Sequence, residues 1–467
     1  MPDRLYVPFL VLVVLVLVDL LVKVIALGLV PERRRAAAGT AWLLVIFFVP
    51  LVGLVVFGLA GGRALRRRPR VQTEAQAGMI VLHNNTYPPL PAEATGPDWL
   101  RGVLALNAKL GWLDPVAGTR VQLYADDHAV TAAMVAAVAE AKRFVHLECA
   151  ALTWDDITEP LVTALVAARQ RGVCVRLSYD AKASARHPGY PTLMTRLDGS
   201  GVERPTAPAA RHSHRNLLVV DGRVAFGGSS LRTPTNAGSG PASNGRRGPE
   251  LAFRVDGPLA HSLSVVFAAD WYLERAEQLP RELLTMPPAY RDGVVGQVLA
   301  SGPGLPSGNQ LPMITSLVYG ARSRLAMTCP FLVPDDSLLA ALATAVRRGV
   351  LVELFVGTES DDKVRQRAQR SGYAALLEAG VRIFRHPGAL AARHLTVDDA
   401  VAVVGSSSQD GSAVSVLLLS TEVVDWIRAI EDGYRAASSE IIPAAWRKRP
   451  LPQRYLDNAL RVVFALR

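Results

Sequence analysis

Two long apolar segments stand at the beginning of the chain. Residues 5–30 are almost continuously apolar, and residues 41–60 form a second run of twenty residues. Each run is long enough to cross a bilayer as a helix. Asp19 and Lys23 interrupt the first run at i,i+4 spacing, so either the two charges pair or Lys23 alone reaches toward the headgroups. The pattern predicts a two-helix membrane anchor.

Basic residues flank both predicted spans, and their distribution indicates an orientation. Residues 33–35 are three arginines in the loop between the spans, and five more arginines follow within residues 63–70. Because positive residues collect on the cytoplasmic side, we expect a two-pass protein of the cell membrane with a cytoplasmic C-terminal body. Cys149, Cys174 and Cys329 have no metal-ligand spacing and fit reduced thiols in such a body.

The remainder of the chain contains one pattern twice. VHLECAALTWDD (145–156) resembles RLAMTCPFLVPDD (324–336), and HRNLLVVDGRVAFGGSS (214–230) resembles AARHLTVDDAVAVVGSSS (391–408). Each copy contains apolar strands, an amphipathic helix and a strand that carries the motif. The fold class predicted is α/β, a pseudo-twofold pair of halves with mainly parallel or mixed sheets that pack face to face.

Loops rich in glycine, proline and serine indicate the boundaries between these parts. The expected division is a membrane anchor at 1–70, a linker at 71–120, a first half at 121–298 and a second half at 299–467. The second half ends in a basic segment, residues 446–467, that is typical of an amphipathic helix. Such a helix either contacts the membrane or packs on its own domain.

Together these features resemble the bacterial cardiolipin synthases of the phospholipase D superfamily, over essentially the whole chain. The two apolar runs, the two motif copies and the DWYLE segment (270–274) carry the resemblance. In that family each half supplies His-x-Lys-x4-Asp followed by Gly-Ser-x-Asn, and the two histidines meet at the pseudo-twofold axis. One imidazole attacks the phosphorus and the other protonates the leaving alkoxide. The resemblance implies neither a metal nor another cofactor.

The first copy of the motif is incomplete. It retains His214, Asp221 and Ser229, but Asn216 occupies the lysine position and Leu231 the asparagine position. An asparagine is neutral and donates a weaker hydrogen bond to a phosphate than a lysine does. The expected role of His214 is that of a nucleophile, with Asn216 and Ser229 as substrate-binding residues.

The second copy departs further from the family pattern. Ala391 stands where the second histidine belongs, Arg393 replaces the lysine and Ser408 the asparagine, whereas Asp398 and Ser406 remain. Arg393 and Ser406 are expected to bind the phosphate. The loss of a general acid typically lowers a rate by about 10² to 10⁴. The sequence therefore predicts impaired or lost phosphatidyl transfer.

Four further residues belong to the expected site or bear on it. Glu250 and Glu422 stand where the family places acids that orient the opposite histidine, so that Glu422 would pair with His214. His394 is expected to point to the other face of its strand, and His386 could act only after a loop rearrangement. The expected residual catalytic set is His214, Asp221, Asp398, Glu250 and Glu422.

Three functions remain open from the sequence. The first is a membrane-anchored, cardiolipin synthase-like protein that binds phospholipid and has little or no activity, with anionic phospholipid (phosphatidylglycerol or cardiolipin) and an intact paralogous synthase as partners. The second is an active cardiolipin synthase or phospholipase D-type phosphatidyltransferase that uses His214. The third is a nucleic-acid-binding phosphodiesterase-like module, which fits the net charge of +10 but not the two spans.

Overall fold

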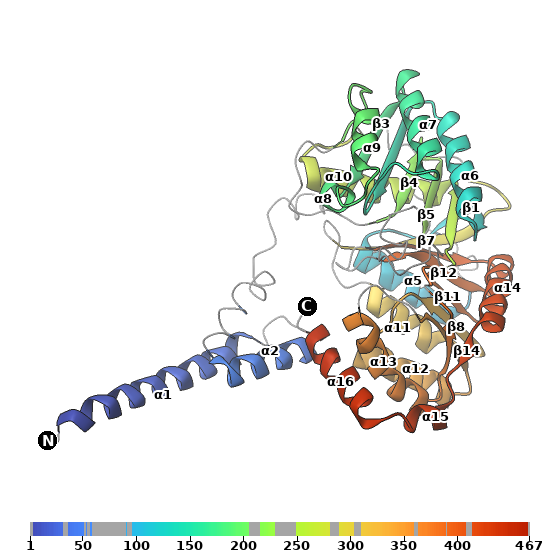
Figure 1. Ribbon diagram of the computed structural model, residues 1–467. Coiled ribbons are helices and arrows are strands. Elements are labelled where there is room, and N and C mark those ends of the chain that lie inside the picture. Colours follow the sequence, from blue (N-terminus) through green and yellow to red (C-terminus); the bar gives the residue numbers. More distant parts are fainter. Residues whose placement is uncertain are drawn as a thin grey trace. The chain divides into compact units, whose positions relative to one another are not determined.

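The computed structural model gives a mixed α/β protein and describes most of the chain (Figure 1). The described residues are 3–30, 36–50, 53, 57, 90, 96–204, 215–228, 249–280, 289–302, 310–358, 363–388, 390–407 and 413–465. His214, Ser229, Leu231 and Ser408 lie outside them, so what is expected of these four residues stays a prediction. The second apolar run, residues 41–60, is described only in part.

Helices and strands alternate along the chain in the order that the repeat predicts. The helices are α1 Asp3–Leu29, α2 Ala36–Phe48, α5 Asp98–Gly111, α6 Asp127–Ala139, α7 Thr158–Gln170, α8 Ala181–Ser184, α9 Tyr190–Leu197, α10 Pro258–Arg275, α11 Gln310–Gly320, α12 Asp336–Arg347, α13 Lys363–Glu378, α14 Thr421–Ala437, α15 Pro443–Arg447 and α16 Leu451–Ala465. The strands are β1 Val116–Tyr124, β2 Phe144–Cys149, β3 Cys174–Tyr179, β4 Leu217–Val220, β5 Val224–Gly228, β6 Ala252–Asp256, β7 Val294–Ser301, β8 Arg324–Cys329, β9 Leu351–Gly357, β10 Arg382–His386, β11 His394–Val397, β12 Val401–Ser407, β13 Ala413–Leu419 and β14 Ser439–Glu440.

The described strands are linked in the order β14-β10-β9-β8-β11-β12-β13-β7-β1-β6-β5-β4-β2-β3. The antiparallel pair β1 and β7 joins two similar series of strands. The first series runs outward from β1 through β6, β5, β4, β2 and β3. The second runs outward from β7 through β13, β12, β11, β8 and β9. In both series the helix-linked strands are parallel, β2 with β3 and β8 with β9, and the others are antiparallel. The predicted mixed α/β fold is thus confirmed.

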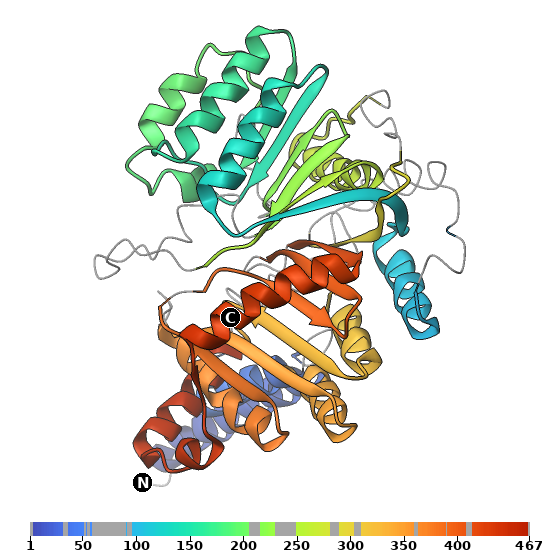
Figure 2. The same ribbon diagram turned by 90° about the vertical axis from the view of Figure 1, so that its right-hand side faces the viewer.

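Helices cover both faces of each strand series. One apolar core lies between β2 and β3 and helices α6, α7 and α9, and another between β8, β9 and β10 and helices α11, α12 and α13. A third core contains α10, α14 and inner-facing residues of both series. Strands β5 and β12 contact each other, so the two series face each other across this third core, as expected from the repeat (Figure 2).

The chain divides into two compact units. One, called here the N-terminal unit, contains residues 1–68, 362–372 and 448–467, and the other, the sheet unit, contains residues 69–361 and 373–447. The expected boundaries after residues 120 and 298 fall inside β1 and β7. These two strands pair with each other, and the expected division of the chain stays a prediction.

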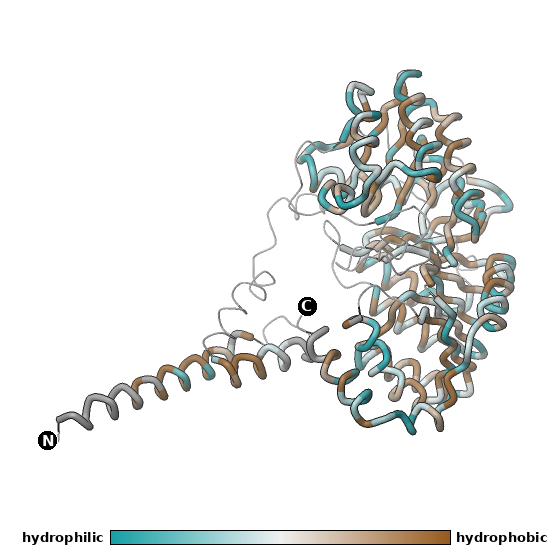
Figure 3. The backbone as a smooth tube through the Cα atoms, viewed as in Figure 1, coloured by the Kyte–Doolittle hydropathy of each residue, from teal (hydrophilic) through white to brown (hydrophobic). Residues whose placement is uncertain are grey.

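Helix α1 of the N-terminal unit contains most of the first apolar run, and its second half consists mostly of hydrophobic residues (Figure 3). The Nζ atom of Lys23 donates to Oδ2 of Asp19 at 2.7 Å, which is the paired alternative of the two considered. Helix α2 contacts both α1 and α16. Among the residues described, no helix combines the length and the apolar character needed to cross a membrane.

Candidate phosphodiester site

The two motif strands occupy equivalent places in their series. Strand β4 lies between β2 and β5, with Leu217 paired to Gly227, and β11 lies between β8 and β12, with His394 paired to Val404. Both pairings are related by the same offset of 177 residues. The backbone therefore reproduces the alignment of the two motifs that the sequence repeat predicts.

This register places Arg393 in the position of Asn216. Asn216 is buried, and its Nδ2 atom donates a long hydrogen bond of 3.5 Å to the carbonyl of Gly228. Arg393 is half-buried beside Cys329. Burial raises the pKa of the Cys329 thiol to about 12, and the positive charge of Arg393 opposes that rise. Arg393 thus brings a cation to the motif position where the first half has only a neutral amide.

Position 391 lies directly beside the first half. The amide groups of Ala391 and Ala392 both donate to the carbonyl of Pro249, at 3.0 and 2.9 Å. The next residue, Glu250, is buried with 5 % of its surface exposed. Glu250 therefore follows directly on the residue that contacts position 391, which is an alanine, and its role as an orienting acid stays a prediction.

A buried arginine makes the corresponding contact from the first motif to the second half. The Nε atom of Arg215 donates to the carbonyl of Ala413 at 3.3 Å, and Nη2 donates to the carbonyl of Ser301 at 2.7 Å. Nη1 forms an ion pair with Asp270 of α10, and both side chains are fully buried. Arg215 thus fastens the start of β4 to strands β7 and β13. The sequence shows only an arginine between two motif positions and, later, an aspartate within the apolar segment that forms α10. Neither residue by itself predicts the ion pair.

The strand registers also identify the counterpart of Glu250. Gly228 pairs with Ala252 in the first half, and Gly405, its equivalent, pairs with Ser415 in the second. Two residues before Ser415 lies Ala413, which therefore corresponds to Glu250. Ala413 carries no group that could accept a hydrogen bond from an imidazole.

The expectation that Glu422 pairs with His214 stays a prediction, because His214 lies outside the described residues. Glu422 lies in the first turn of α14, beyond the end of β13, and its side chain is exposed. A glutamate there stabilises the helix N-terminus through the helix dipole. The register gives position 413, an alanine, as the place from which an acid would face the first motif.

The carboxylates of the two motif aspartates accept hydrogen bonds from backbone amides. Asp221 has a φ of 53° and accepts hydrogen bonds from the amides of Lys142, Arg143 and Phe144, at 2.8 to 2.9 Å. These amides begin β2, at the far end of β4 from Asn216. The aspartate therefore ties the turn after the motif strand to the start of its neighbour.

Asp398 repeats this arrangement in the second half. It has a φ of 49° and accepts from the amides of Arg322, Ser323 and Arg324 and from the hydroxyl of Ser323. Burial would raise the pKa of Asp398, but these hydrogen bonds outweigh burial and lower it. A positive φ is best tolerated by glycine, asparagine and aspartate, which explains part of the requirement for aspartate here.

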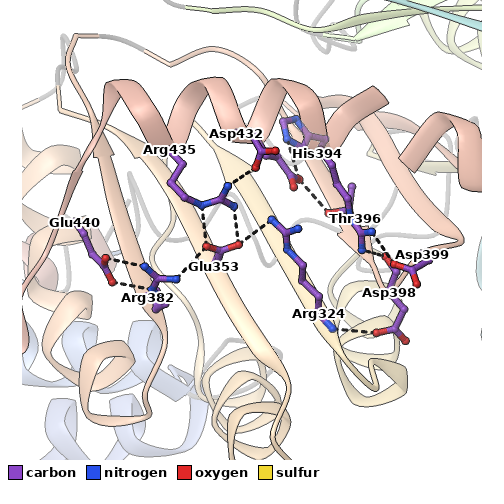
Figure 4. A network of polar contacts seen from close by, with 12 residues as sticks. Arg324, Glu353, Arg382, His394, Thr396, Asp398, Asp399, Asp432, Arg435 and Glu440 are labelled. Carbon is purple, nitrogen blue, oxygen red and sulfur yellow. Dashed lines mark hydrogen bonds and ion pairs between the residues drawn. The ribbon is translucent and has the colours of Figure 1, made fainter. Parts of the chain in front are cut away.

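Neither remaining histidine of the second half faces the site. His394 points toward α14 (Figure 4). Its Nε2 atom lies 3.5 Å from Oε1 of Glu431 on α14, and its ring stacks on Tyr434. His386 packs edge-on against the same tyrosine, and burial lowers its pKa. Successive residues of a strand point to opposite faces, so His394 and Arg393 point apart as the alternation predicts.

A network of charges on the α14 side of β8, β9 and β10 supports the second half. Glu353 is buried, and its carboxylate accepts from Arg324 at 3.1 Å and from Arg435 at 2.8 and 3.1 Å (Figure 4). Arg382 lies 3.5 Å from Glu353 and is also paired with Glu440 of β14. Three arginines around this one carboxylate join α14 to the sheet, and nothing in the local sequence pattern predicts this network.

Ser406 lies at the end of β12 and is buried. Its hydroxyl donates to the carbonyl of Val414 at 3.4 Å, a weak bond that leaves the group able to turn toward another acceptor. No group of three or more His, Cys, Asp or Glu side chains with the arrangement of a metal site occurs in the described part of the chain.

Each of the two strand series carries one motif strand, β4 in the first and β11 in the second. The family described as cardiolipin synthase, PLD-like domain, matches residues 314–428. The cardiolipin synthase A of Serratia proteamaculans (strain 568) is 28% identical over 94% of this chain and 95% of its own length. That of Yersinia pseudotuberculosis serotype O:1b (strain IP 31758) is also 28% identical, over the same shares.

One solved structure supports the fold independently. The phosphatidylserine synthase of Haemophilus influenzae Rd KW20 superposes with a TM-score of 0.56 over 78% of this chain and 98% of its own, at 12% identity. At that identity the likeness concerns the fold alone. The sequence matches make the chain similar to the bacterial cardiolipin synthases and, in residues 314–428, to their PLD-like domain.

Proposed function

We propose that this protein is a membrane-anchored relative of cardiolipin synthase that binds phospholipid phosphodiesters but has lost most or all phosphatidyl transfer. The substrate class follows from the relatives named cardiolipin synthase A, which match nearly the whole chain. The loss of activity follows from the groups at the two motif positions. The anionic phospholipids phosphatidylglycerol and cardiolipin are the proposed ligands, and an intact paralogous synthase is the proposed protein partner.

One observation carries the proposal that transfer is lost. Two histidine–acid pairs across the halves are expected, and each lacks one member. Glu250 lies beside Ala391, which has no imidazole. The first motif approaches Ala413 through Arg215, and Ala413 has no carboxylate. Because the two histidines act as one catalytic unit, a single imidazole without its orienting acid leaves little of the rate.

Phosphate binding requires fewer groups than transfer and is therefore proposed to remain. Arg393 supplies a cation at the motif position, and Ser406 supplies a hydroxyl at the end of the neighbouring strand. Asn216 adds an amide that, among the described residues, donates one long hydrogen bond. We assign Asp221 and Asp398 a supporting role, because their carboxylates hold the backbone of the motif turns.

The membrane anchor belongs to the same proposal. Residues 5–30 and 41–60 are proposed to insert into the cell membrane, with the C-terminal body on the cytoplasmic side. Pairing of Asp19 with Lys23 neutralises both charges within α1 and lowers the cost of placing them in lipid. The expected division into an anchor, a linker and two halves is part of this proposal.

Binding to lipid tests the retained function without requiring turnover. The full-length protein in an uncharged detergent is titrated with short-chain phosphatidylglycerol and, separately, with short-chain phosphatidylcholine. Phosphatidylglycerol should bind more tightly, and Arg393→Ala should weaken its binding about tenfold, the loss of one charge-assisted contact. Arg322→Ala removes the same charge from an exposed side chain and should change little. Equal binding of the two lipids, or no effect of Arg393→Ala, would contradict the proposal.

A second candidate function is an active phosphatidyltransferase that uses His214 with an atypical acid. The match to proteins named cardiolipin synthase A over 94% of the chain favours it. The two candidates differ in one measurable property, the turnover of phosphatidylglycerol.

A further inference from the structure

A histidine and a glutamate lie together in the core between β11 and α14. The side chains of His394 and Glu431 are both completely buried, and Nε2 of His394 lies 3.5 Å from Oε1 of Glu431. The hydroxyl of Thr396 donates to the same carboxylate oxygen at 3.0 Å. We propose that His394 and Glu431 form a binding site for one proton, which the folded protein retains at neutral and weakly alkaline pH.

The carboxylate of Glu431 has few other groups to compensate its charge. Among the described residues, no arginine or lysine lies within ion-pair distance of it. Its second oxygen, Oε2, accepts no hydrogen bond from these residues. An ionised carboxylate in an apolar core is costly unless a cation pairs with it. His394 is therefore the group that can balance the charge of Glu431.

Helix α14 packs on β10, β11 and β12, and the other ionisable groups on this side of the sheet do not serve Glu431. The charged residues there pair with one another: Arg428 with Asp399, Arg435 with Glu353 and Asp432, Arg382 with Glu353 and Glu440, and Arg324 with Glu353. His386 of β10 lies against Tyr434, and burial lowers its pKa, so it stays neutral. Burial and the charge of Glu431 raise the pKa of Tyr434, which keeps its proton. The residues of β12 in this core, Ala402 and Val404, do not ionise.

One proton makes the buried pair neutral. The proton belongs to the pair as a whole, either as an imidazolium beside a carboxylate or as an imidazole beside a carboxylic acid. Without it the pair would carry a buried negative charge, and with two protons it would carry a buried positive charge. Desolvation opposes both of these states. The folded protein therefore favours the state with one proton.

The unfolded chain holds this proton less firmly, which couples folding to pH. In the unfolded chain the two side chains titrate separately, with ordinary pKa values of about 4.3 for glutamate and about 6.5 for histidine. Above about pH 6.5 the unfolded chain has released the proton, so folding must take one up. The stabilisation is therefore complete near pH 6 and falls as the pH rises, by about tenfold in the unfolding constant for each pH unit.

This proton fastens the second motif strand, β11, to α14. Arg393 immediately precedes β11, so the pair also holds the chain at that motif position. The inference uses only the buried contacts of β11 and α14. It rests neither on lipid binding nor on the loss of phosphatidyl transfer.

Urea unfolding of the full-length protein in an uncharged detergent, followed as a function of pH, tests the site. In Glu431→Gln the acid is absent, and the remaining histidine is neutral in both states above about pH 7. The unfolding constant of the unmodified protein, divided by that of Glu431→Gln, should therefore rise about tenfold between about pH 7 and pH 8. A ratio that does not change with pH would overturn the proposal, because a purely structural contact contributes equally at every pH.

Further variants keep the test decisive where Glu431→Gln does not fold. His394→Leu leaves the acid alone in the core, so its unfolding constant relative to the unmodified protein should rise about tenfold between about pH 5 and pH 6. His394→Leu with Glu431→Leu removes both groups and should abolish the pair's pH dependence. Asp425→Asn, which removes an exposed carboxylate of α14, should keep the pH dependence of the unmodified protein. A double variant with the same pH dependence as Asp425→Asn would overturn the proposal.

Discussion

Ala413 occupies in the second half the place that Glu250 occupies in the first. The strand registers fix this relationship. Glu250 lies two positions before Ala252, which pairs with Gly228, and Ala413 lies two positions before Ser415, which pairs with Gly405. Glu250 lies beside Ala391, and Ala413 lies beside the first motif. The site has therefore kept the acid of one pair and the predicted histidine of the other.

Restoring the missing groups should restore some transfer. We expect that Ala391→His, Ala413→Glu, Asn216→Lys and Arg393→Lys together produce cardiolipin from phosphatidylglycerol, measured by thin-layer separation of labelled lipid. Activity should be partial, because a displacement of about 1 Å can cost a hundredfold. The set without Ala391→His should be inactive, since lysines cannot replace the general acid. Equal activity with and without Ala413→Glu would contradict the assignment of position 413.

Loss of the Asp398 carboxylate should destabilise the second half at neutral pH. Hydrogen bonds lower the pKa of this group in the folded state, so its contribution is present above the pKa of the unfolded chain and is lost as the pH falls through the lower folded value. Asp398→Asn should lower the free energy of unfolding by about 1 kcal/mol at pH 7, because water compensates part of the loss. It should also reduce the acid dependence of stability below about pH 4.

A matched substitution separates this effect from the change of net charge. Asp425→Asn removes an exposed carboxylate on α14 and should change stability by less than about 0.5 kcal/mol. Thermal unfolding of the full-length protein across pH measures both variants. If Asp398→Asn and Asp425→Asn behave alike, the carboxylate of Asp398 does not hold the turn as described.

Arg215 and Asp270 should be strongly coupled. Arg215→Ala leaves the carboxylate of Asp270 buried without its cation and should cost about 3 to 5 kcal/mol of unfolding free energy. Replacing both residues, Arg215→Met with Asp270→Leu, should cost less than Arg215→Ala alone. Urea unfolding of the single and double variants gives the coupling energy. Additive losses would show that the two groups contribute independently.

The repeat predicted the mixed fold and the equivalence of the two motif strands, because apolar segments typical of strands and turn residues recur at a nearly constant spacing. It could not place the second acid. The connection between Gly228 and Ala252 is much longer than that between Ser407 and Ala413, so counting along the chain cannot align the two halves there, and Glu422 was expected only from the family resemblance. Only hydrogen-bond register shows that position 413 is the equivalent one.

Buried charges were the other part that the sequence did not disclose. Arg215, Glu353 and Asp457 each depend on partners more than 50 residues away or on another helix. Nothing in the local pattern distinguishes such residues from surface charges. Their partners become apparent only when the strands and helices have been placed.

Turnover of phosphatidylglycerol by the unmodified protein, compared with His214→Ala, tests the central claim most directly. Purified full-length protein is incubated with labelled phosphatidylglycerol, and cardiolipin formation and glycerol release are followed beside an intact cardiolipin synthase. We predict that neither product forms above the level of His214→Ala, because neither histidine–acid pair is complete. Robust transfer by the unmodified protein that disappears in His214→Ala would contradict this account and establish a phosphatidyltransferase that works with one motif histidine.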